Sequence, residues 1–165
     1  MPSFLDRKKF LSLSLAGATG LIIGKPLITN AQQQKPDPLD KELVKEFVGV
    51  SHRDVNRVKE LLEKTPGLLN CSWDWGGGDF ESGLEAAGHV GNKDIANYLL
   101  SKGARMNLFC AAMLGKLDIV KATLDSYPDL KLSKGPHGLQ LLHHATKGGD
   151  DAKAVLSYLQ QINAA

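Results

Sequence analysis

Three segments of the 165-residue chain repeat one pattern, and this repetition constrains the fold more than any other feature. In residues 84–91, 108–115 and 142–149, a leucine is followed three and four positions later by small residues and seven positions later by a glycine. Small side chains on a short helix let a neighbouring helix pack closely, and a glycine lets the chain leave the helix in a left-handed conformation. The pattern therefore predicts three short helices, each ending at its glycine.

A second apolar run follows two of these glycines. Apolar residues recur at intervals of three and four positions in residues 95–100 and 119–124, which is typical of one face of a helix. The first run stops at Lys102-Gly103, and the second stops before Pro128, which has no amide hydrogen to continue a helix. The predicted unit is helix, glycine turn, helix, and the predicted fold class is all-α.

The chain resembles an ankyrin repeat protein over most of its length. Residues 91–107 are similar to the second helix and exit of that family, and residues 138–145 to its hairpin glycine and Leu-His-x-Ala opening. Gln140-Leu141 stand where the family has Thr-Pro. The resemblance implies an ankyrin-repeat solenoid of about four helix-turn-helix units over residues 39–163, in which stacked units share a core that no single unit could form.

The spacing of the units varies along the chain. Gly115 and Gly149 are 34 residues apart, close to the family period of about 33, whereas Gly91 and Gly115 are only 24 apart. The resemblance thus implies short or missing hairpin fingers. Between the second and third units we expect no finger, so that Asn107 caps the next helix directly.

The first unit departs most from the family pattern. It begins near Asp40, its second helix covers about residues 54–62, and Arg53 stands where a glycine is expected. Terminal units of a stack face solvent on one side, so degeneracy there is expected. The segment between this unit and the second, residues 68–80, is long and unusual.

Residues 1–31 have the features of a bacterial signal peptide. Basic residues around Arg7 and Lys8 precede an apolar stretch that is too short to span a bilayer as a stable helix. The pattern resembles the twin-arginine (Tat) type, with Lys8 in place of the second arginine, so the Sec route stays open. Small residues before Gln32 fit cleavage there, and an uncleaved N-terminal anchor is the alternative. We predict residues 32–38 to be a polar linker.

The distribution of charge argues against a nucleic-acid partner. Residues 1–31 hold four of the 20 basic residues and one of the 18 acidic residues, which leaves 16 basic and 17 acidic residues in the mature chain. Binding to phosphates requires a basic stripe, and the mature chain has no block of basic residues. We expect a periplasmic or secreted monomer that binds no nucleic acid and, after signal cleavage, no membrane.

The segment before the second unit holds the first candidate binding residues. Trp73, Asp74, Trp75 and Asp79 surround three glycines, which permit an unusual backbone path. Large aromatic side chains on a finger are suited to anchor a partner protein. The alternative is that the tryptophans fold back and cover the first helix pair. We expect Phe80 to lie in the core.

Histidines provide the remaining candidates. His137 follows Gly135-Pro136 in a predicted tight turn, where it would project near a finger tip, and His89 near the end of an inner helix could contact a ligand pocket. The resemblance implies that His143 bonds the backbone of an adjacent unit. His143 and His144 point about 100° apart on one helix, whereas zinc needs three or four convergent ligands, so we predict no metal ligand and no cofactor.

The two cysteines, Cys71 and Cys110, are predicted to be reduced and mostly buried. Export permits a disulfide, but the resemblance places the two residues in units that are not neighbours, too far apart for closure.

The sequence predicts a binding protein and not an enzyme. It holds no serine nucleophile elbow, phosphate loop, zinc-peptidase helix or paired-cysteine motif. The leading hypothesis is a periplasmic protein–protein interaction module with an unidentified protein partner, which it binds through Trp73, Asp74, Trp75, Asp79, His89 and His137. The alternatives are a small-molecule or metal-binding protein with hydrolase activity that uses His89, His137 and His144, and an immunity or accessory factor for an exported enzyme.

Overall fold

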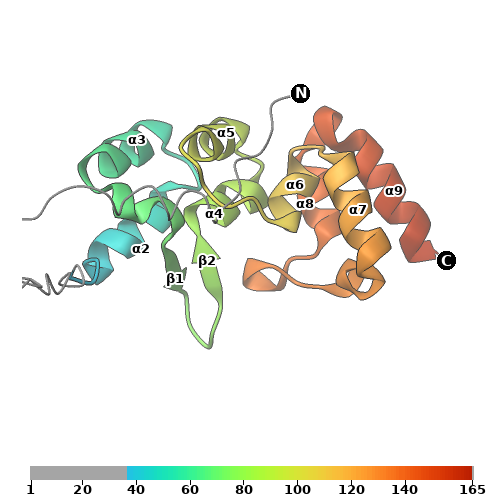
Figure 1. The fold of residues 1–165 in the computed structure, drawn as a ribbon, viewed down its shortest axis with the longest axis horizontal. Helices are drawn as coiled ribbons and strands as arrows, with labels where there is room; N and C mark the ends of the chain where they lie inside the picture. Colours follow the sequence, from blue (N-terminus) through green and yellow to red (C-terminus); the bar gives the residue numbers. More distant parts are fainter. Residues whose placement is uncertain (1–36, 165) are drawn as a thin grey trace, which may run out of the picture. The chain divides into compact units, whose positions relative to one another are not determined.

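The computed structural model describes residues 37–164, and within them the chain forms eight α-helices and one two-stranded sheet (Figure 1). The all-α prediction is therefore confirmed, apart from this small sheet. The signal peptide predicted at residues 1–31 and most of the linker predicted at residues 32–38 lie outside the described residues. No helix within the described range has the length and apolar character needed to cross a membrane.

The first helix pair consists of α2 (Lys41–Val50) and α3 (Val55–Lys64). The side chains of Asp40 and Asp54 cap them, each accepting a hydrogen bond of 2.9 Å from a backbone N–H in the first turn. Capping satisfies amide groups that have no partner within the helix. Phe47 of α2 is fully buried in the core beneath the pair. The predicted start near Asp40 is confirmed.

A β-hairpin separates the first pair from the second. After the 3₁₀-helix η1 (Pro66–Asn70), strands β1 (Ser72–Asp74) and β2 (Phe80–Ser82) pair antiparallel, with Trp73 opposite Glu81. A hairpin thus forms within the segment that the sequence predicted to be long and unusual, residues 68–80, although short or missing hairpins were predicted for the fold as a whole. The turn is made by three glycines with positive φ, a conformation that glycine adopts without steric cost.

The expectation that Phe80 lies in the core is wrong, because Phe80 is 61% exposed. Phe80 belongs to strand β2 of the two-stranded sheet. Its side chain points to a face of the sheet that no second layer covers. The neighbouring Glu81, on the opposite face of β2, is fully buried. In a strand, successive side chains point to opposite sides, so burying Glu81 exposes Phe80.

The second helix pair consists of α4 (Gly83–Val90) and α5 (Lys93–Ser101). Ser82 and Glu85 form a reciprocal capping box at the start of α4. At its end, Gly91 has φ 81° and ψ 22°, the left-handed conformation predicted from the repeat pattern.

The third pair, α6 (Leu108–Met113) and α7 (Leu117–Ser126), follows without an intervening strand. The side chain of Asn107 accepts a 2.7 Å hydrogen bond from the amide of Cys110, so the prediction that Asn107 caps this helix directly is confirmed. Gly115 leaves α6 with φ 69°.

The last pair is preceded by two short 3₁₀-helices, and a third joins its two α-helices. In chain order these elements are η2 (Pro128–Leu132), η3 (Pro136–Gly138), α8 (Leu141–Lys147), η4 (Gly149–Ala152) and α9 (Lys153–Ala164).

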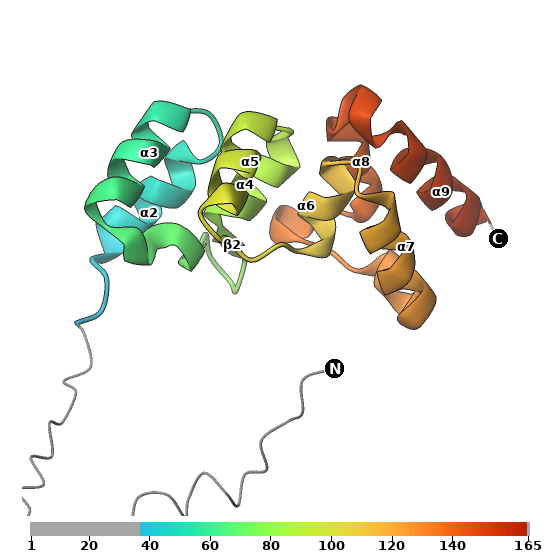
Figure 2. The same ribbon diagram turned by 45° about the horizontal axis from the view of Figure 1, so that its top comes forward.

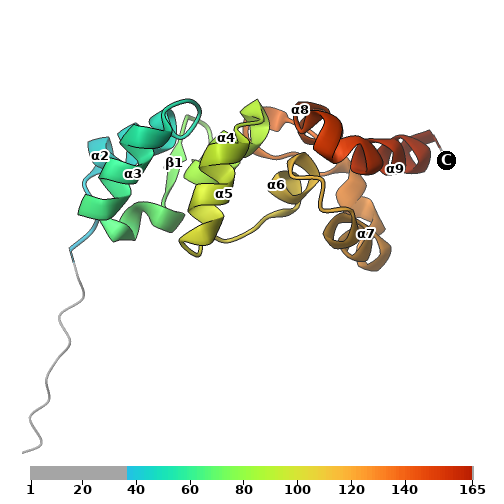
Figure 3. The same cartoon turned by 90° about the horizontal axis from the view of Figure 1, so that it is seen from above.

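The helix pairs pack in succession within residues 37–164 (Figure 2). The first helices of the pairs contact one another from α2 to α4, α4 to α6 and α6 to α8, and each contacts the second helix of its own pair. However, α4 also contacts α8 directly, and the last two pairs lie beside each other beyond α4 and α5 (Figure 3). The α5–α6 connection is too short to hold a full finger, which allows this closer packing.

Candidate metal centre

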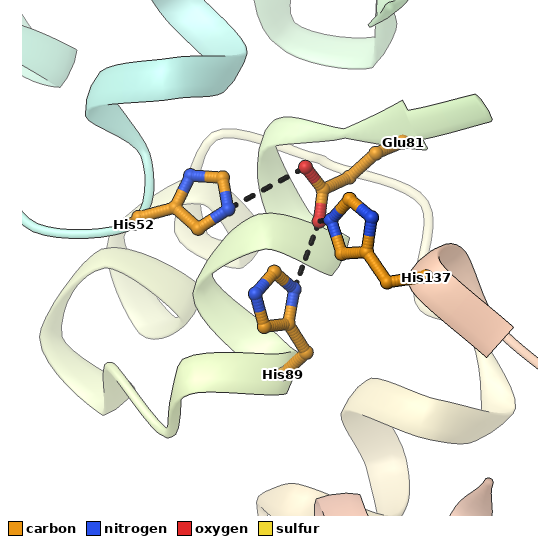
Figure 4. Close-up of side chains that lie close together, drawn as sticks. All are labelled: His52, Glu81, His89 and His137. Carbon is orange, nitrogen blue, oxygen red and sulfur yellow. Dashed lines mark ion pairs between the residues drawn. The ribbon is translucent and has the colours of Figure 1, made fainter. Parts of the chain in front are cut away.

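Four side chains from separate elements converge on one point beside the hairpin (Figure 4). His52 comes from the turn after α2, Glu81 from β2, His89 from the last turn of α4, and His137 from η3. One nitrogen or oxygen atom of each lies within 4.8 Å of the others. Imidazole nitrogens and carboxylate oxygens are ligands of transition-metal ions in proteins, so this cluster has the composition of a metal centre.

The spacing of these atoms fits a single ion. Glu81 Oε2 lies 3.5 Å from His52 Nε2, and Glu81 Oε1 lies 2.8 Å from His89 Nδ1 and 3.4 Å from His137 Nε2. A tetrahedral ion with bonds of about 2.0–2.1 Å spaces its ligands about 3.3 Å apart. The three contacts with Glu81 lie close to that value, whereas separations within the whole set reach up to 4.8 Å, so the histidines would move toward an ion to coordinate it.

Backbone carbonyls orient His52 toward the centre. Its Nδ1 lies 3.1 Å from the carbonyl oxygen of Val48 and 3.0 Å from that of Gly49, at the end of α2. A carbonyl only accepts hydrogen bonds, so Nδ1 carries the proton. In neutral His52, Nε2 therefore presents a lone pair to the cluster.

A carboxylate orients His137 in the same way. Its Nδ1 lies 2.7 Å from Asp79 Oδ2, and its backbone amide donates a 2.8 Å hydrogen bond to Asp79 Oδ1. These contacts with His137 lower the pKa of Asp79 although partial burial opposes this. Carboxylate–histidine pairs of this kind commonly fix the tautomer of metal-ligating histidines. His137 Nε2 is thus directed at Glu81.

The backbone at His137 is itself unusual. Among the described residues it is the only non-glycine residue with positive φ, at 59°. This conformation costs a residue with a Cβ atom about 1–2 kcal/mol, and such strain occurs often at functional sites. The two hydrogen bonds to Asp79 hold it in place.

Glu81 is a fully buried carboxylate. Its Oε2 accepts a 2.8 Å hydrogen bond from the indole Nε1 of Trp75. Burial by itself would raise the pKa of Glu81, but the contacts with His89 and Trp75 and the charge of His52 lower it below its ordinary value. Glu81 is therefore an anion enclosed by the protein.

The contact between Glu81 and His89 does not satisfy either group as a hydrogen bond. The atoms Glu81 Oε1 and His89 Nδ1 lie 2.8 Å apart, but the ring geometry is not aligned for donation, and both atoms are buried without a hydrogen-bond partner. The contact is therefore electrostatic and not a hydrogen bond. Leaving buried polar atoms unpaired is costly, so two such atoms facing each other indicate a site for a further species.

The cluster as a whole needs positive charge. Glu81 is an anion, and in their neutral forms His52 and His137 would turn lone pairs toward it. Groups that can only accept hydrogen bonds do not stabilise one another. A cation between them, supplied either by protonation of the histidines or by a metal ion, removes the repulsion.

His143 positions the segment that carries His89. Its Nε2 lies 2.9 Å from the carbonyl oxygen of His89, so His143 does bond backbone outside its own pair, but not in the adjacent unit, as the resemblance implied. The unit it contacts is the second pair, which the direct α4–α8 packing brings within reach.

His144 takes no part in the cluster. It is buried beside the ring of Phe109, at a centroid distance of 5.0 Å, and its Nδ1 contacts the carbonyl of Gln140 at 3.0 Å. Burial lowers the pKa of His144. The predicted combination of His89, His137 and His144 is thus wrong in its third member, whose place is taken by His52 because His144 points into the core.

The hairpin tryptophans and Asp74 have separate roles. Trp73 is half-buried and packs against the core of the first two pairs, as the fold-back alternative predicted. Trp75 is 40% exposed and contacts Glu81. Asp74 accepts hydrogen bonds from the amides of Gly76 and Gly78 and closes the hairpin turn.

Both cysteines are unbridged. Burial raises the pKa of Cys71 to about 11 and that of Cys110 to about 12, so both thiols stay protonated. The prediction of reduced, mostly buried cysteines is confirmed.

His89, His137, Trp75 and Asp79 were candidates from the sequence, and the structure brings these four together. His52 and Glu81 were not candidates. The prediction of no metal ligand rested on the divergence of the adjacent His143 and His144, and the metal-binding alternative combined His89 and His137 with His144 and not with His52. One signal was present. When Arg53 is aligned with Gly91, His52 lies one position before the aligned site and His89 two positions before it. Both histidines are thus close to the point where the first helix of their unit ends.

No protein-family model, no curated protein and no solved structure matches the chain.

Proposed function

We propose that this protein binds a divalent first-row transition-metal ion through His52, Glu81, His89 and His137. The observation that carries the proposal is the fully buried carboxylate of Glu81, enclosed by three imidazole nitrogens without an aligned hydrogen bond to any of them. Asp79 and Trp75 support the ligands from outside, which is the arrangement that metal-binding histidines and carboxylates usually have.

The donor set favours particular ions. Three nitrogens and one oxygen suit Zn²⁺, Co²⁺, Ni²⁺, Fe²⁺ or Cu²⁺, whereas Mg²⁺ and Ca²⁺ prefer oxygen ligands throughout. Zn²⁺ is the reference ion for a test because it accepts four ligands of this kind and has no redox chemistry.

The experiment compares the full-length protein with Glu81→Gln, which keeps the size of the side chain and removes its charge. After equilibrium dialysis against Zn²⁺, elemental analysis should find one ion per chain in the unchanged protein. Loss of a directly bound carboxylate should weaken binding by more than the roughly 10–100-fold seen for supporting residues. Zn²⁺ at 100 times its Kd should also stabilise the unchanged protein against unfolding by about 2.7 kcal/mol.

Glu63→Gln is the matched control, since Glu63 is an exposed glutamate of α3 outside the cluster. It should bind Zn²⁺ as the unchanged protein does. Circular dichroism checks that each variant is folded. The proposal fails if the unchanged protein takes up no stoichiometric metal, which would mean that protons alone neutralise the cluster, or if Glu81→Gln binds Zn²⁺ equally well.

We propose that the scaffold around this site is an ankyrin-type solenoid. Four successive helix pairs, glycine turns with positive φ at Gly91 and Gly115, and contacts between the first helices of successive pairs support this assignment. The direct contact between α4 and α8 departs from a regular row. Export to the periplasm rests on the sequence of residues 1–31 and belongs to the same proposal.

A second candidate function is recognition of another exported protein by the hairpin. It is favoured by Phe80, a large aromatic residue of the hairpin that is 61% exposed and so could contact a partner. Phe80→Ser should leave Zn²⁺ binding unchanged, because Phe80 points away from Glu81, and should abolish recovery of one specific partner in a crosslinked periplasmic pull-down. Identical recovery by both proteins would exclude this role for the hairpin.

A further inference from the structure

The geometry points to a ligand class for the proposed metal centre: we infer that a small organic carboxylate binds between the metal ion and Arg53. This inference rests on the proposed function and adds to it what the ion would bind. It follows from a cavity beside the cluster, from the side on which the cluster opens, and from the charge available in the cavity wall.

A cavity of about 460 Å³ adjoins the cluster and is lined by Gly49, His52, Arg53, Trp75 and His137. Cavities that hold small molecules in proteins typically measure about 300–1,000 Å³. Two of its five lining residues, His52 and His137, are members of the cluster, so a molecule in the cavity would lie against the metal centre.

The cluster opens toward this cavity and is closed on the other side. The side chains of His52 and His137 are 22% and 35% exposed, whereas Glu81 is fully buried and His89 is 13% exposed. An ion held by these four residues would therefore be reached by solvent past His52 and His137. Transition-metal ions expand from four to five or more ligands, so an additional ligand would bind from the cavity.

Arg53 supplies a free positive charge at the cavity wall. It is exposed and takes part in none of the ion pairs found among residues 37–164. Arg57, four positions later, is held by Glu46 and Glu60 at 2.6 and 2.7 Å. No acidic residue lines the cavity. A guanidinium on the wall of a cavity beside a proposed metal centre is suited to a carboxylate, which it can bind with two parallel hydrogen bonds.

Trp75 indicates that the ligand also has an apolar part. Its indole nitrogen donates a hydrogen bond to Glu81, while Trp75 is still 40% exposed and lines the cavity. The face of an indole ring offers apolar contact and stacking. Gly49, which also lines the cavity, has no side chain, and a Cβ atom there would meet nothing within 4 Å. The walls thus leave room for a planar or aliphatic group attached to the carboxylate.

The test uses full-length protein loaded with Co²⁺, whose visible absorption reports its ligands. Sodium benzoate should change the spectrum in a saturable manner, and it should bind more tightly than acetate, which has too little apolar surface to reach Trp75. Inorganic phosphate, offered as a separate titration, should bind more weakly than benzoate. Arg53→Gln should keep the Co²⁺ affinity and weaken benzoate by about tenfold, as expected for the loss of one charge-assisted contact.

Arg57→Gln is the matched control and should bind both Co²⁺ and benzoate like the unchanged protein. Co²⁺ binding without a spectral response to benzoate, or equal benzoate affinity in Arg53→Gln, would overturn this inference and leave the metal proposal intact. Tighter binding of phosphate than of benzoate would overturn the carboxylate assignment. Failure of the unchanged protein to bind Co²⁺ would overturn the proposed function together with this inference.

Discussion

The connections before and after the second helix pair differ in length and in secondary structure. Between α3 and α4 the chain builds η1 and a β-hairpin, whereas between α5 and α6 it passes directly to the cap at Asn107 without a strand. The long connection supplies polar groups to the cluster: Glu81 as a member, with Trp75 and Asp79 as supports. The short connection supplies none.

The short connection nevertheless shapes the site through packing. Without a finger, α4 contacts both α6 and α8. This places His143 against the carbonyl of His89 and brings His137, which immediately precedes the last pair, to the hairpin. The difference teaches that a succession of helix pairs can create a site in two ways: a long connection brings the functional groups, and a short one lets pairs that are distant in the chain pack closely enough to complete the set.

The largest expected effect concerns the close packing of the last pair against the third pair, which follows the short connection. Gly115 has φ 69°, and a Cβ atom at this position would clash with the carbonyl oxygen of Asp151. Gly115→Ala should reduce the free energy of unfolding by about 3 kcal/mol, because left-handed strain and overpacking add. Gly103→Ala is the control. Its φ is 93°, but nothing lies within 4 Å of the added atom, so only strain of about 1 kcal/mol is expected. Equal losses in urea unfolding would mean that close packing is not what constrains Gly115.

A smaller effect is expected in the hairpin, where Asp79 supports a proposed ligand without being one. Asp79→Asn should weaken Zn²⁺ binding by about 10–100-fold, because His137 loses the carboxylate that fixes its tautomer. Asp74→Asn removes the other carboxylate of the same hairpin, which closes the turn and does not touch the cluster. It should bind Zn²⁺ nearly as the unchanged protein does. If both variants lose metal equally, the hairpin acts only through its shape.

The smallest effect is expected on the outer face of α3, away from both connections. Hydrogen bonds from Lys64 and Arg57 lower the pKa of Glu60 from 4.5 to about 2. A depressed pKa stabilises the fold above the ordinary value, and this contribution is lost as the pH falls from about 4.5 to about 2. Stability of the unchanged protein should therefore decline slightly more steeply over this range than that of Glu60→Gln.

Because these pairs are exposed, the effect should be small and should shrink further in salt. Glu63→Gln, which removes a neighbouring glutamate outside these ion pairs, should follow the unchanged protein. Superimposable pH profiles for the unchanged protein and Glu60→Gln would show that the ion pairs contribute nothing to stability.

The helices and their ends could be predicted from the sequence because the groups that determine them are local. Asp40, Asp54 and Asn107 each cap a helix by bonding an amide three residues later, and Gly91 and Gly115 leave helices with positive φ. Such signals lie within one turn of the chain and need no tertiary contact to be recognised.

The finger was only partly predictable. Residues 72–82 could be recognised as unusual, with three glycines between two short segments, but the pairing of Trp73 with Glu81 could not. Register decides which side of β2 faces the protein, and a shift by one residue would bury Phe80 and expose Glu81. Nothing in the local sequence favours burying a glutamate, since the groups that stabilise it come from elsewhere.

The sequence by itself determined the repeating helix pairs, the turns between them, and the polar and aromatic character of the segment before the second pair. Only the tertiary structure decided that His52, Glu81, His89 and His137 share one point, since the first and last are 85 positions apart in the chain. The physical reason is that a helix cap depends on atoms a few bonds away, whereas the cluster depends on how a hairpin and three helix pairs are placed by the burial of their apolar faces.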